Sequence, residues 1–366
     1  MNLSQNKMPP SKRKFVELLS NRKLKLIVYD FLNYSIEGLC RSTINYINDR
    51  TGIITKDAFM SAAFKNKMWS GREGFINYDG IGLLRGLGDV LDVLEYDGGY
   101  PISKIDYEDH RSPKTLSLPY IDGDFLKNET GYKLHDYQEE GINKVIGLTY
   151  CDSGEGGILK LPTNAGKTII TMGISKVFDG IIKTLVLVPS ANLAEQTYRD
   201  YQKSDMNTGL LSASIKGKKK RKDLIKNSDH IIMTNKLFLN LSELFQDEEW
   251  VLIYDEAHEF GDKTSIAIRS SLGHCQYRVG LTATMPGEKG DKYKDTLIRH
   301  HFGDNLVELD QKELIDRGIS SKLHIDLVTI KTDADVLSHT DSGWDWQREQ
   351  QFYSNNYQMF LGMLEV

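Results

Sequence analysis

The chain has 366 residues, of which 40% are hydrophobic and 27% charged, and its net charge is −5 at pH 7. This length predicts two or three domains with a sizeable core, and the charge excludes a globally basic protein, so any nucleic-acid contact must use local patches. No apolar run approaches the roughly 18 residues that a membrane span requires, and the three cysteines lie far apart without CxxC spacing, which disfavours a structural zinc site and a disulfide framework.

The N-terminal segment, residues 1–25, is polar and carries seven Lys or Arg residues against one Glu. We interpret it as a solvated tail or surface helix, with nucleic-acid contact as the less favoured alternative. No apolar stretch of a signal peptide follows its basic start, so this segment and the cysteine pattern together predict a cytoplasmic protein.

Residues 26–110 predict a small α+β domain, with a strand at 26–29 and a helix at 35–47. A second, amphipathic helix is expected to cover the small sheet, because apolar residues follow helical spacing at Leu87, Val90, Leu91 and Leu94. The polar, turn-rich stretch at 111–130 predicts a linker to the next domain.

Within the small domain, residues 64–76 interleave Lys and Arg with Trp69 and Phe75 in a Gly-rich segment that predicts a hairpin. Such a hairpin could line a nucleic-acid backbone. The favoured interpretation is that it packs its aromatic face on a core.

From Tyr132 onward, strands alternate with helices, which predicts an α/β fold with a doubly wound parallel sheet. A helix is expected to run to about Leu148, and another from a cap at Ser190 or Asn192 through Tyr201. The nearly all-apolar strands expected here are residues 158–161, 184–189, 231–234, 251–254 and 277–281. A ligand should bind at the carboxyl ends of these strands.

Leu-Pro-Thr-Asn-Ala-Gly-Lys-Thr at residues 161–168 lies between an expected strand and an expected helix. Backbone N–H groups of such a loop hold phosphates, Lys167 would reach the outer phosphates, and Thr168 would place its hydroxyl on Mg²⁺. The full phosphate-loop pattern has Gly where this chain has Leu161, so the loop by itself could also be an ordinary turn into a helix.

Asp255 and Glu256 follow the strand at 251–254, at the same edge where the loop is expected. A carboxylate here can hold Mg²⁺ through water, and its neighbour can orient and polarise an attacking water. Two surface acids at a strand end are the alternative. Thr282 and Thr284 end the next strand and could hydrogen-bond this acidic segment, or form a plain turn.

In chain order, the segments Leu-His-Asp-Tyr-Gln, Pro-Thr-Asn-Ala-Gly-Lys-Thr, Asp-Glu-Ala-His and Leu-Thr-Ala-Thr resemble the motifs of DEAD/DEAH-type superfamily 2 helicases. The resemblance implies that residues 131–320 form the first RecA-like core, a P-loop NTPase. The N-terminal Trp69-Ser70-Gly71-Arg72 resembles the small domain of the phage UvsW family, which implies a phage-infected bacterial host cytoplasm as location.

The resemblance assigns roles by position. ATP would be bound by Tyr132, Gln138, Thr163, Asn164, Ala165, Gly166, Lys167 and Thr168. Lys167, Asp255 and Glu256 would be catalytic, Thr168 and Asp255 would hold Mg²⁺, and His258, Thr282 and Thr284 would couple the nucleotide to nucleic acid. The residues that would contact the nucleic-acid backbone are Pro189, Ser190, Asn192, Gln196, Thr234 and Asn235.

The basic run at residues 216–222, which includes Lys218, Lys219, Lys220 and Arg221, has six positive charges in seven residues. It predicts a loop, with phosphate contact and plain solvation left as equal alternatives.

The resemblance implies an ATP-dependent DNA or RNA–DNA helicase that remodels branched replication or recombination intermediates in DNA recombination and repair. Such motors use a second RecA-like core, and residues 321–366 predict only its start. We expect that another chain supplies the rest of this core or that it was lost by truncation. The alternatives are a non-motor nucleic-acid-binding module with a retained ATP site, and a restriction-type translocase subunit.

Overall fold

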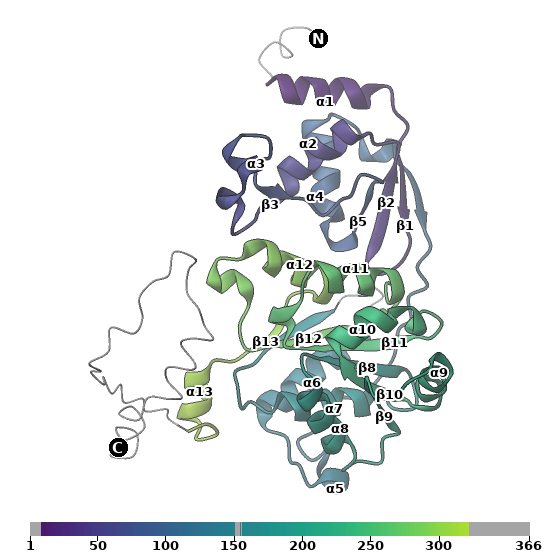
Figure 1. The fold of residues 1–366 in the computed structure, drawn as a ribbon, viewed down its shortest axis with the longest axis vertical. Helices are drawn as coiled ribbons and strands as arrows, with labels where there is room; N and C mark the ends of the chain where they lie inside the picture. The colour runs from purple at the N-terminus through teal and green to yellow at the C-terminus, as the bar shows by residue number, and fades with distance from the viewer. Residues whose placement is uncertain (1–8, 151–153, 155, 322–366) are drawn as a thin grey trace, which may run out of the picture. The chain divides into compact units, whose positions relative to one another are not determined.

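The computed structural model describes residues 9–150, 154 and 156–321, and within them the chain up to Ser320 forms one compact unit (Figure 1). The predicted start of a second core at 321–366 lies outside the described residues except for Ser321. None of the described helices combines the length and apolarity that a bilayer crossing requires.

The N-terminal part is built on a four-stranded sheet in the order β5-β2-β1-β6. β1 pairs with β6 in parallel and with β2 antiparallel. Its strands and helices are β1 (Lys25–Val28), β2 (Asn33–Glu37), β5 (Ile81–Leu83), β6 (Asp106–Asp109), α1 (Pro10–Ser20), α2 (Arg41–Thr51) and α4 (Leu87–Asp92). Phe15 of α1, Ile44 of α2 and Val90 of α4 pack on Tyr34 and Ile36 in one apolar cluster, as expected for helices covering this sheet.

The helix predicted at residues 35–47 is confirmed only from Arg41 onward, where α2 lies, and is wrong in its first residues, because Asn33–Glu37 is the strand β2. β2 lies between β1 and β5, so both neighbours supply its backbone hydrogen bonds. Gly38 follows with φ of +90°, in the left-handed region that favours glycine, and α2 starts only at Arg41.

The hairpin predicted at residues 64–76 is also wrong. Its first residues end the short helix α3 (Ala62–Lys65), and its strand β4 (Arg72–Glu73) pairs with β3 (Ile53–Ile54) outside the segment. Between them, Gly71 has φ of +78°, and a Cβ there would lie 2.9 Å from the Phe64 ring.

The second part is a seven-stranded sheet in the order β13-β7-β12-β11-β8-β10-β9. Every strand pairing in it is parallel, which confirms the predicted doubly wound fold. Its strands are β7 (Gly157–Lys160), β8 (Lys183–Val188), β9 (Thr208–Leu211), β10 (His230–Thr234), β11 (Trp250–Asp255), β12 (Arg278–Thr282) and β13 (Asn305–Glu308). The edge strands β9 and β13 were not predicted, because both are short and neither is a continuous apolar run.

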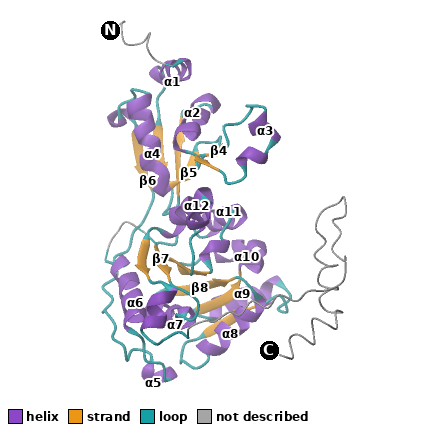
Figure 2. Ribbon diagram, turned by 90° about the vertical axis from the view of Figure 1, so that its left-hand side faces the viewer, coloured by secondary structure: helices purple, strands orange, loops and turns teal. Residues whose placement is uncertain are grey.

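Helices cover both faces of this sheet, with α6, α7 and α8 on one side and α10, α11 and α12 on the other (Figures 1 and 2). Alternate residues of β11 enter the two cores: Val251 and Ile253 face the first set of helices, and Leu252 faces the second. The helices of this part are α5 (Lys127–Thr130), α6 (Asp136–Leu148), α7 (Lys167–Phe178), α8 (Ala191–Tyr201), α9 (Lys218–Asn227), α10 (Asn235–Leu241), α11 (Asp262–Ser271), α12 (Lys292–Phe302) and α13 (Gln311–Asp316).

Side chains of α11 and α12 contact the N-terminal part. The Arg269 guanidinium donates to Asn33 Oδ1 at 2.7 Å and to the Gly82 carbonyl at 3.3 Å. Phe75 stacks on Tyr293 with ring centroids 5.4 Å apart. These bonds link strands β2 and β5 directly to the helices that cover the parallel sheet.

Candidate active site

The loop between β7 and α7 is turned by two residues in the left-handed region, Asn164 (φ 67°) and Gly166 (φ 74°). Asn tolerates this conformation better than most residues, so the loop forms although Asn stands where Gly is frequent. Leu161, in place of the first Gly, is fully buried at the strand end. α7 begins at Lys167, so the N–H groups of its first turn lack intrahelical acceptors and favour an anion.

Two side chains of helix α6 hydrogen-bond to the backbone of the loop between β7 and α7. The Ala165 carbonyl accepts hydrogen bonds from Gln138 Nε2 at 2.9 Å and from the Tyr137 hydroxyl at 3.1 Å. Gln138 Oε1 accepts from the His135 N–H at 2.9 Å, so both ends of this buried amide are used within the protein. Sequence reasoning missed Tyr137, because nothing in the pattern distinguishes it from a core aromatic residue.

The structure brings together Lys167, which begins α7, and Glu256, which follows β11, although β12 lies between β7 and β11 in the sheet. Lys167 Nζ lies 3.7 Å from Glu256 Oε1, and 3.4 Å from the carbonyl oxygens of both Leu161 and Pro162. Glu256 itself has φ of 53°. This left-handed backbone is costly for a glutamate and is typical of residues held at functional sites.

Asp255 ends β11 and is 8% exposed. Burial raises the pKa of its carboxyl to about 6, the Glu256 carboxylate adds to the rise, and Lys167 opposes it. The Asp255 carboxylate is therefore poorly stabilised by the protein alone. A cation beside it would supply the missing stabilisation.

The oxygen donors at this edge fit Mg²⁺. The Thr168 hydroxyl and the Asp255 carboxylate are hard ligands of the kind that Mg²⁺ prefers. Within the described residues, no three His, Cys, Asp or Glu side chains form a metal-binding group.

His258 connects Glu256 to the end of β12 through two contacts of one ring nitrogen. His258 Nδ1 lies 3.2 Å from both Glu256 Oε2 and Thr282 Oγ1. The Thr282 hydroxyl donates to the Thr284 carbonyl at 2.9 Å. The three residues that were assigned a coupling role are thus connected in space, through the Thr284 backbone rather than through its side chain.

Comparison with known proteins shows which proteins this arrangement resembles. Residues 131–287 match the family model described as type III restriction enzyme, res subunit. The ATP-dependent DNA helicase uvsW of Enterobacteria phage T4 is 21% identical over 321 residues, which cover 84% of this chain and 60% of that protein. Over residues 131–287, this chain therefore resembles the core of superfamily 2 helicases such as UvsW.

Two further matches support this similarity. A putative DNA 3'-5' helicase, Rad25, of Halobacterium salinarum is 27% identical over 235 residues, 63% of this chain and 34% of that protein. A crystal structure of the UvsW helicase from bacteriophage T4 shares the fold, with a TM-score of 0.56, 18% identity, and coverage of 77% of this chain and 99% of that chain. The chain thus spans less than two thirds of the length of either curated relative.

The residues assigned to nucleic acid lie beyond two adjacent strands of the parallel sheet, β8 and β10. The Ser190 hydroxyl accepts from the Leu193 N–H and caps α8, whereas the Thr234 hydroxyl accepts from the Leu237 N–H and caps α10. Pro189 and Asn235 adjoin these caps, and the exposed Asn192 and Gln196 lie on α8. The structure therefore brings these six residues to one edge of the sheet.

The basic run is helical, so the predicted loop at residues 216–222 is wrong. α9 starts at Lys218, and Lys218, Lys219 and Lys220 are exposed along it. Ile225 anchors the helix in the core, and Lys and Arg have high helix propensity, which together favour a helix over a loop. The Arg221 side chain folds toward the residues before α9, where its Nε donates to the Ile215 carbonyl at 2.8 Å.

Tyr132 lies near the loop's supporting helix and contacts Lys203. Lys203 Nζ donates to the Tyr132 hydroxyl at 2.8 Å and lies 5.3 Å from the ring centroid. Sequence reasoning gave no role to Lys203, which no motif contains. The assignment of Tyr132 and Gln138 to the adenine base stays a prediction.

Proposed function

We propose that this protein is an ATP-dependent helicase or translocase that acts on DNA or RNA–DNA, with branched replication or recombination intermediates as its substrate class. The observation that carries the proposal is the 3.7 Å approach of Lys167 to Glu256 beside a loop whose Asn164 and Gly166 are left-handed. Similarity to proteins named DNA helicases supports it.

In this proposal, the loop N–H groups and Lys167 bind the outer phosphates of ATP. Thr168 and Asp255 hold Mg²⁺, which neutralises charge on those phosphates. Glu256 accepts a hydrogen bond from the attacking water and orients it. Lys167, now beside Glu256, would turn toward the phosphates when ATP enters.

The nucleic-acid strand would lie along the edge formed by residues 189–196 and 234–235, with α9 as an additional phosphate contact. The contacts of His258 with Glu256 and Thr282 would carry a change at the nucleotide site to the end of β12. A change at Glu256 would alter one of the two partners of His258 directly.

An ATPase assay with and without DNA tests the proposal. We expect the 366-residue chain to bind ATP and DNA but to hydrolyse ATP poorly without a second RecA-like core. Lys167→Ala should lose ATP binding, and Glu256→Gln should keep it. Lys144→Ala, which changes an exposed lysine on α6, is the matched control and should behave as wild type. If no form binds ATP, the proposal is wrong.

Two finer parts of the proposal need their own measurements. Binding of four-way and forked DNA, compared with linear duplex of equal length, tests the preference for branched substrates. The requirement for a second RecA-like core stays a prediction, and vigorous unwinding by the 366-residue chain alone would contradict it.

A restriction-type translocase subunit is a second candidate, favoured by the description of the matching family model. It would hydrolyse ATP with the same residues but move along linear duplex without separating strands. Displacement of a bound protein from linear DNA without strand separation would favour it. A non-motor module would bind DNA and ATP without turnover.

A further inference from the structure

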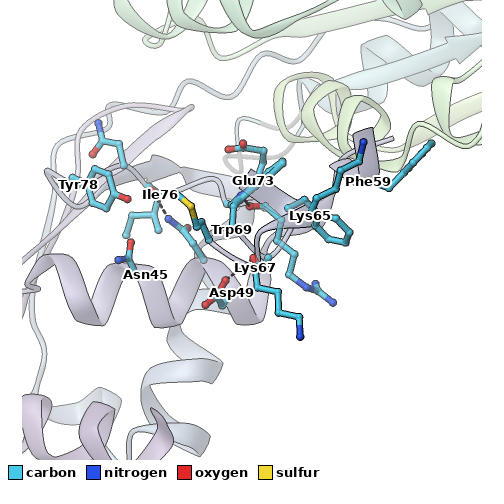
Figure 3. Close-up of a pocket in the computed structure, with 16 residues that line it drawn as sticks. Asn45, Asp49, Phe59, Lys65, Lys67, Trp69, Glu73, Ile76 and Tyr78 are labelled. Atoms are coloured by element: carbon cyan, nitrogen blue, oxygen red, sulfur yellow. Dashed lines mark hydrogen bonds between the residues drawn. The ribbon is translucent and has the colours of Figure 1, made fainter. Parts of the chain in front are cut away.

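A groove of about 1230 Å³ lies in the N-terminal part and is lined entirely by residues between Asn45 and Tyr78 (Figure 3). None of its lining residues belongs to the phosphate loop or to the edge of the parallel sheet. Tyr78 and Asn45 lie at one end, Trp69 and Asp49 in the middle, and Lys65 and Phe59 at the other end. The labelled side chains thus spread from Tyr78 to Phe59, so a chain-like ligand could contact several of them.

Large apolar side chains are exposed along this groove. Tyr78 is 57% exposed, Phe59 57% and Met68 79%. Trp69 is held in place because its Nε1 donates to the Arg72 carbonyl at 3.0 Å. The Arg41 guanidinium lies 4.6 Å from the centroid of the Tyr78 ring and supports one face of it. The exposed Tyr78 ring and the half-buried Trp69 ring are each held by a neighbouring group, and they offer stacking surfaces to a ligand.

The groove also offers cationic and amide groups. Lys65 and Lys67 are exposed, and neither makes an ion pair within the described part of the chain. Lys67 has φ of 55°, a left-handed conformation that a lysine adopts at a cost. The exposed Asn45 amide makes no hydrogen bond to any described residue, whereas Asn48 is fixed by donation to the Ile76 carbonyl at 2.8 Å.

We propose that this groove binds a short single-stranded segment of nucleic acid, with bases stacked on Tyr78 and Trp69 and phosphates on Lys65 and Lys67. Base pairing and stacking hide base faces inside a duplex, so only unpaired bases can use these rings. The Asn45 amide offers both a donor and an acceptor to a base edge. The inference rests on the proposed function, because the groove would be a second binding site for the unpaired strand of a branched substrate.

Photocrosslinking of the full 366-residue chain locates the strand. The probe is an oligodeoxythymidine that carries one 5-iodouracil, and the crosslinked peptides are identified by mass spectrometry. We expect crosslinks at Tyr78 or Trp69, competed by unlabelled single strand. Crosslinks only in residues 131–320 would overturn this proposal and leave the proposed helicase function intact.

Fluorescence anisotropy with the same oligonucleotide measures the contribution of the groove. Loss of one stacked base and one phosphate contact should weaken binding at least about fivefold in the double variant Tyr78→Ala/Lys65→Ala. The matched control is Tyr96→Ala/Lys104→Ala, which removes an exposed tyrosine and an exposed lysine elsewhere in the N-terminal part.

Equal weakening by both double variants, or no weakening by either, would contradict the assignment of the groove. Retained duplex binding in the groove variant separates a lost single-strand contact from misfolding. If the wild-type chain binds neither single strand nor duplex, the proposed function itself fails. Capture of a protein segment by the groove without nucleic-acid binding would also overturn the proposal.

Discussion

The buried histidines His300 and His301 of α12 lead us to predict that the free energy of unfolding falls in mild acid. Burial lowers the pKa of His300 from 6.5 to about 4, with a further contribution from Arg85, and burial lowers that of His301 from 6.5 to about 3. His301 is satisfied as a neutral ring, since its Nδ1–H donates to the Leu297 carbonyl and its Nε2 accepts from Ser265. His300 instead packs edge-on against Phe75, with ring centroids 4.5 Å apart.

The direction of the effect follows from proton binding. Between about pH 6.5 and pH 4, the unfolded chain takes up a proton on each histidine and the folded chain does not, so stability falls as the pH falls. Going from about pH 7.5 to about pH 5, each histidine costs about 2 kcal/mol of unfolding free energy. Asp255 acts in the opposite direction, because its raised pKa lets the folded state bind a proton first.

Urea unfolding at these two pH values, compared between wild type and His300→Gln, isolates one histidine from all other titrating groups. The variant should lose about 2 kcal/mol less than wild type on acidification. His110→Gln is the control, because the His110 side chain is 57% exposed and should leave the acid-induced loss unchanged. Identical losses in wild type and His300→Gln would refute the reasoning.

Three further predictions concern the phosphate loop, the basic helix α9 and the contact of α11 with the N-terminal sheet. Gly166→Ala should abolish ATP binding measured by calorimetry, because a Cβ would lie 2.5 Å from Gln138 Nε2 and φ is left-handed, which alone costs about 1–2 kcal/mol. Replacing all three lysines of residues 218–220 by Gln should reduce the slope of log K against log salt for duplex by roughly 0.9 for each lysine that contacts a phosphate, and an unchanged slope would show that α9 is only solvated. Arg269→Ala should destabilise the protein by about 3 kcal/mol in the same urea assay, because Asn33 and the Gly82 carbonyl lose a charged donor.

The sequence by itself determined the parallel sheet and the order of its motifs. Five apolar strands that alternate with helices can only be covered on both faces, and parallel strands must end at one edge. Hence Lys167, Asp255 and Thr282 could be assigned to the same edge before their contacts were known. Asn164 could likewise be accepted in the loop from its tolerance of left-handed backbone.

Only the tertiary structure decided the contacts that cross between elements. Residues 33–37 became a strand because β1 and β5 supply hydrogen bonds on both sides, which local propensity does not encode. The basic run became a helix because Ile225 anchors it. Gln138 proved to hold the Ala165 carbonyl, and the groove near Trp69 emerged where a hairpin was expected, since pairing partners far along the chain set where each segment lies.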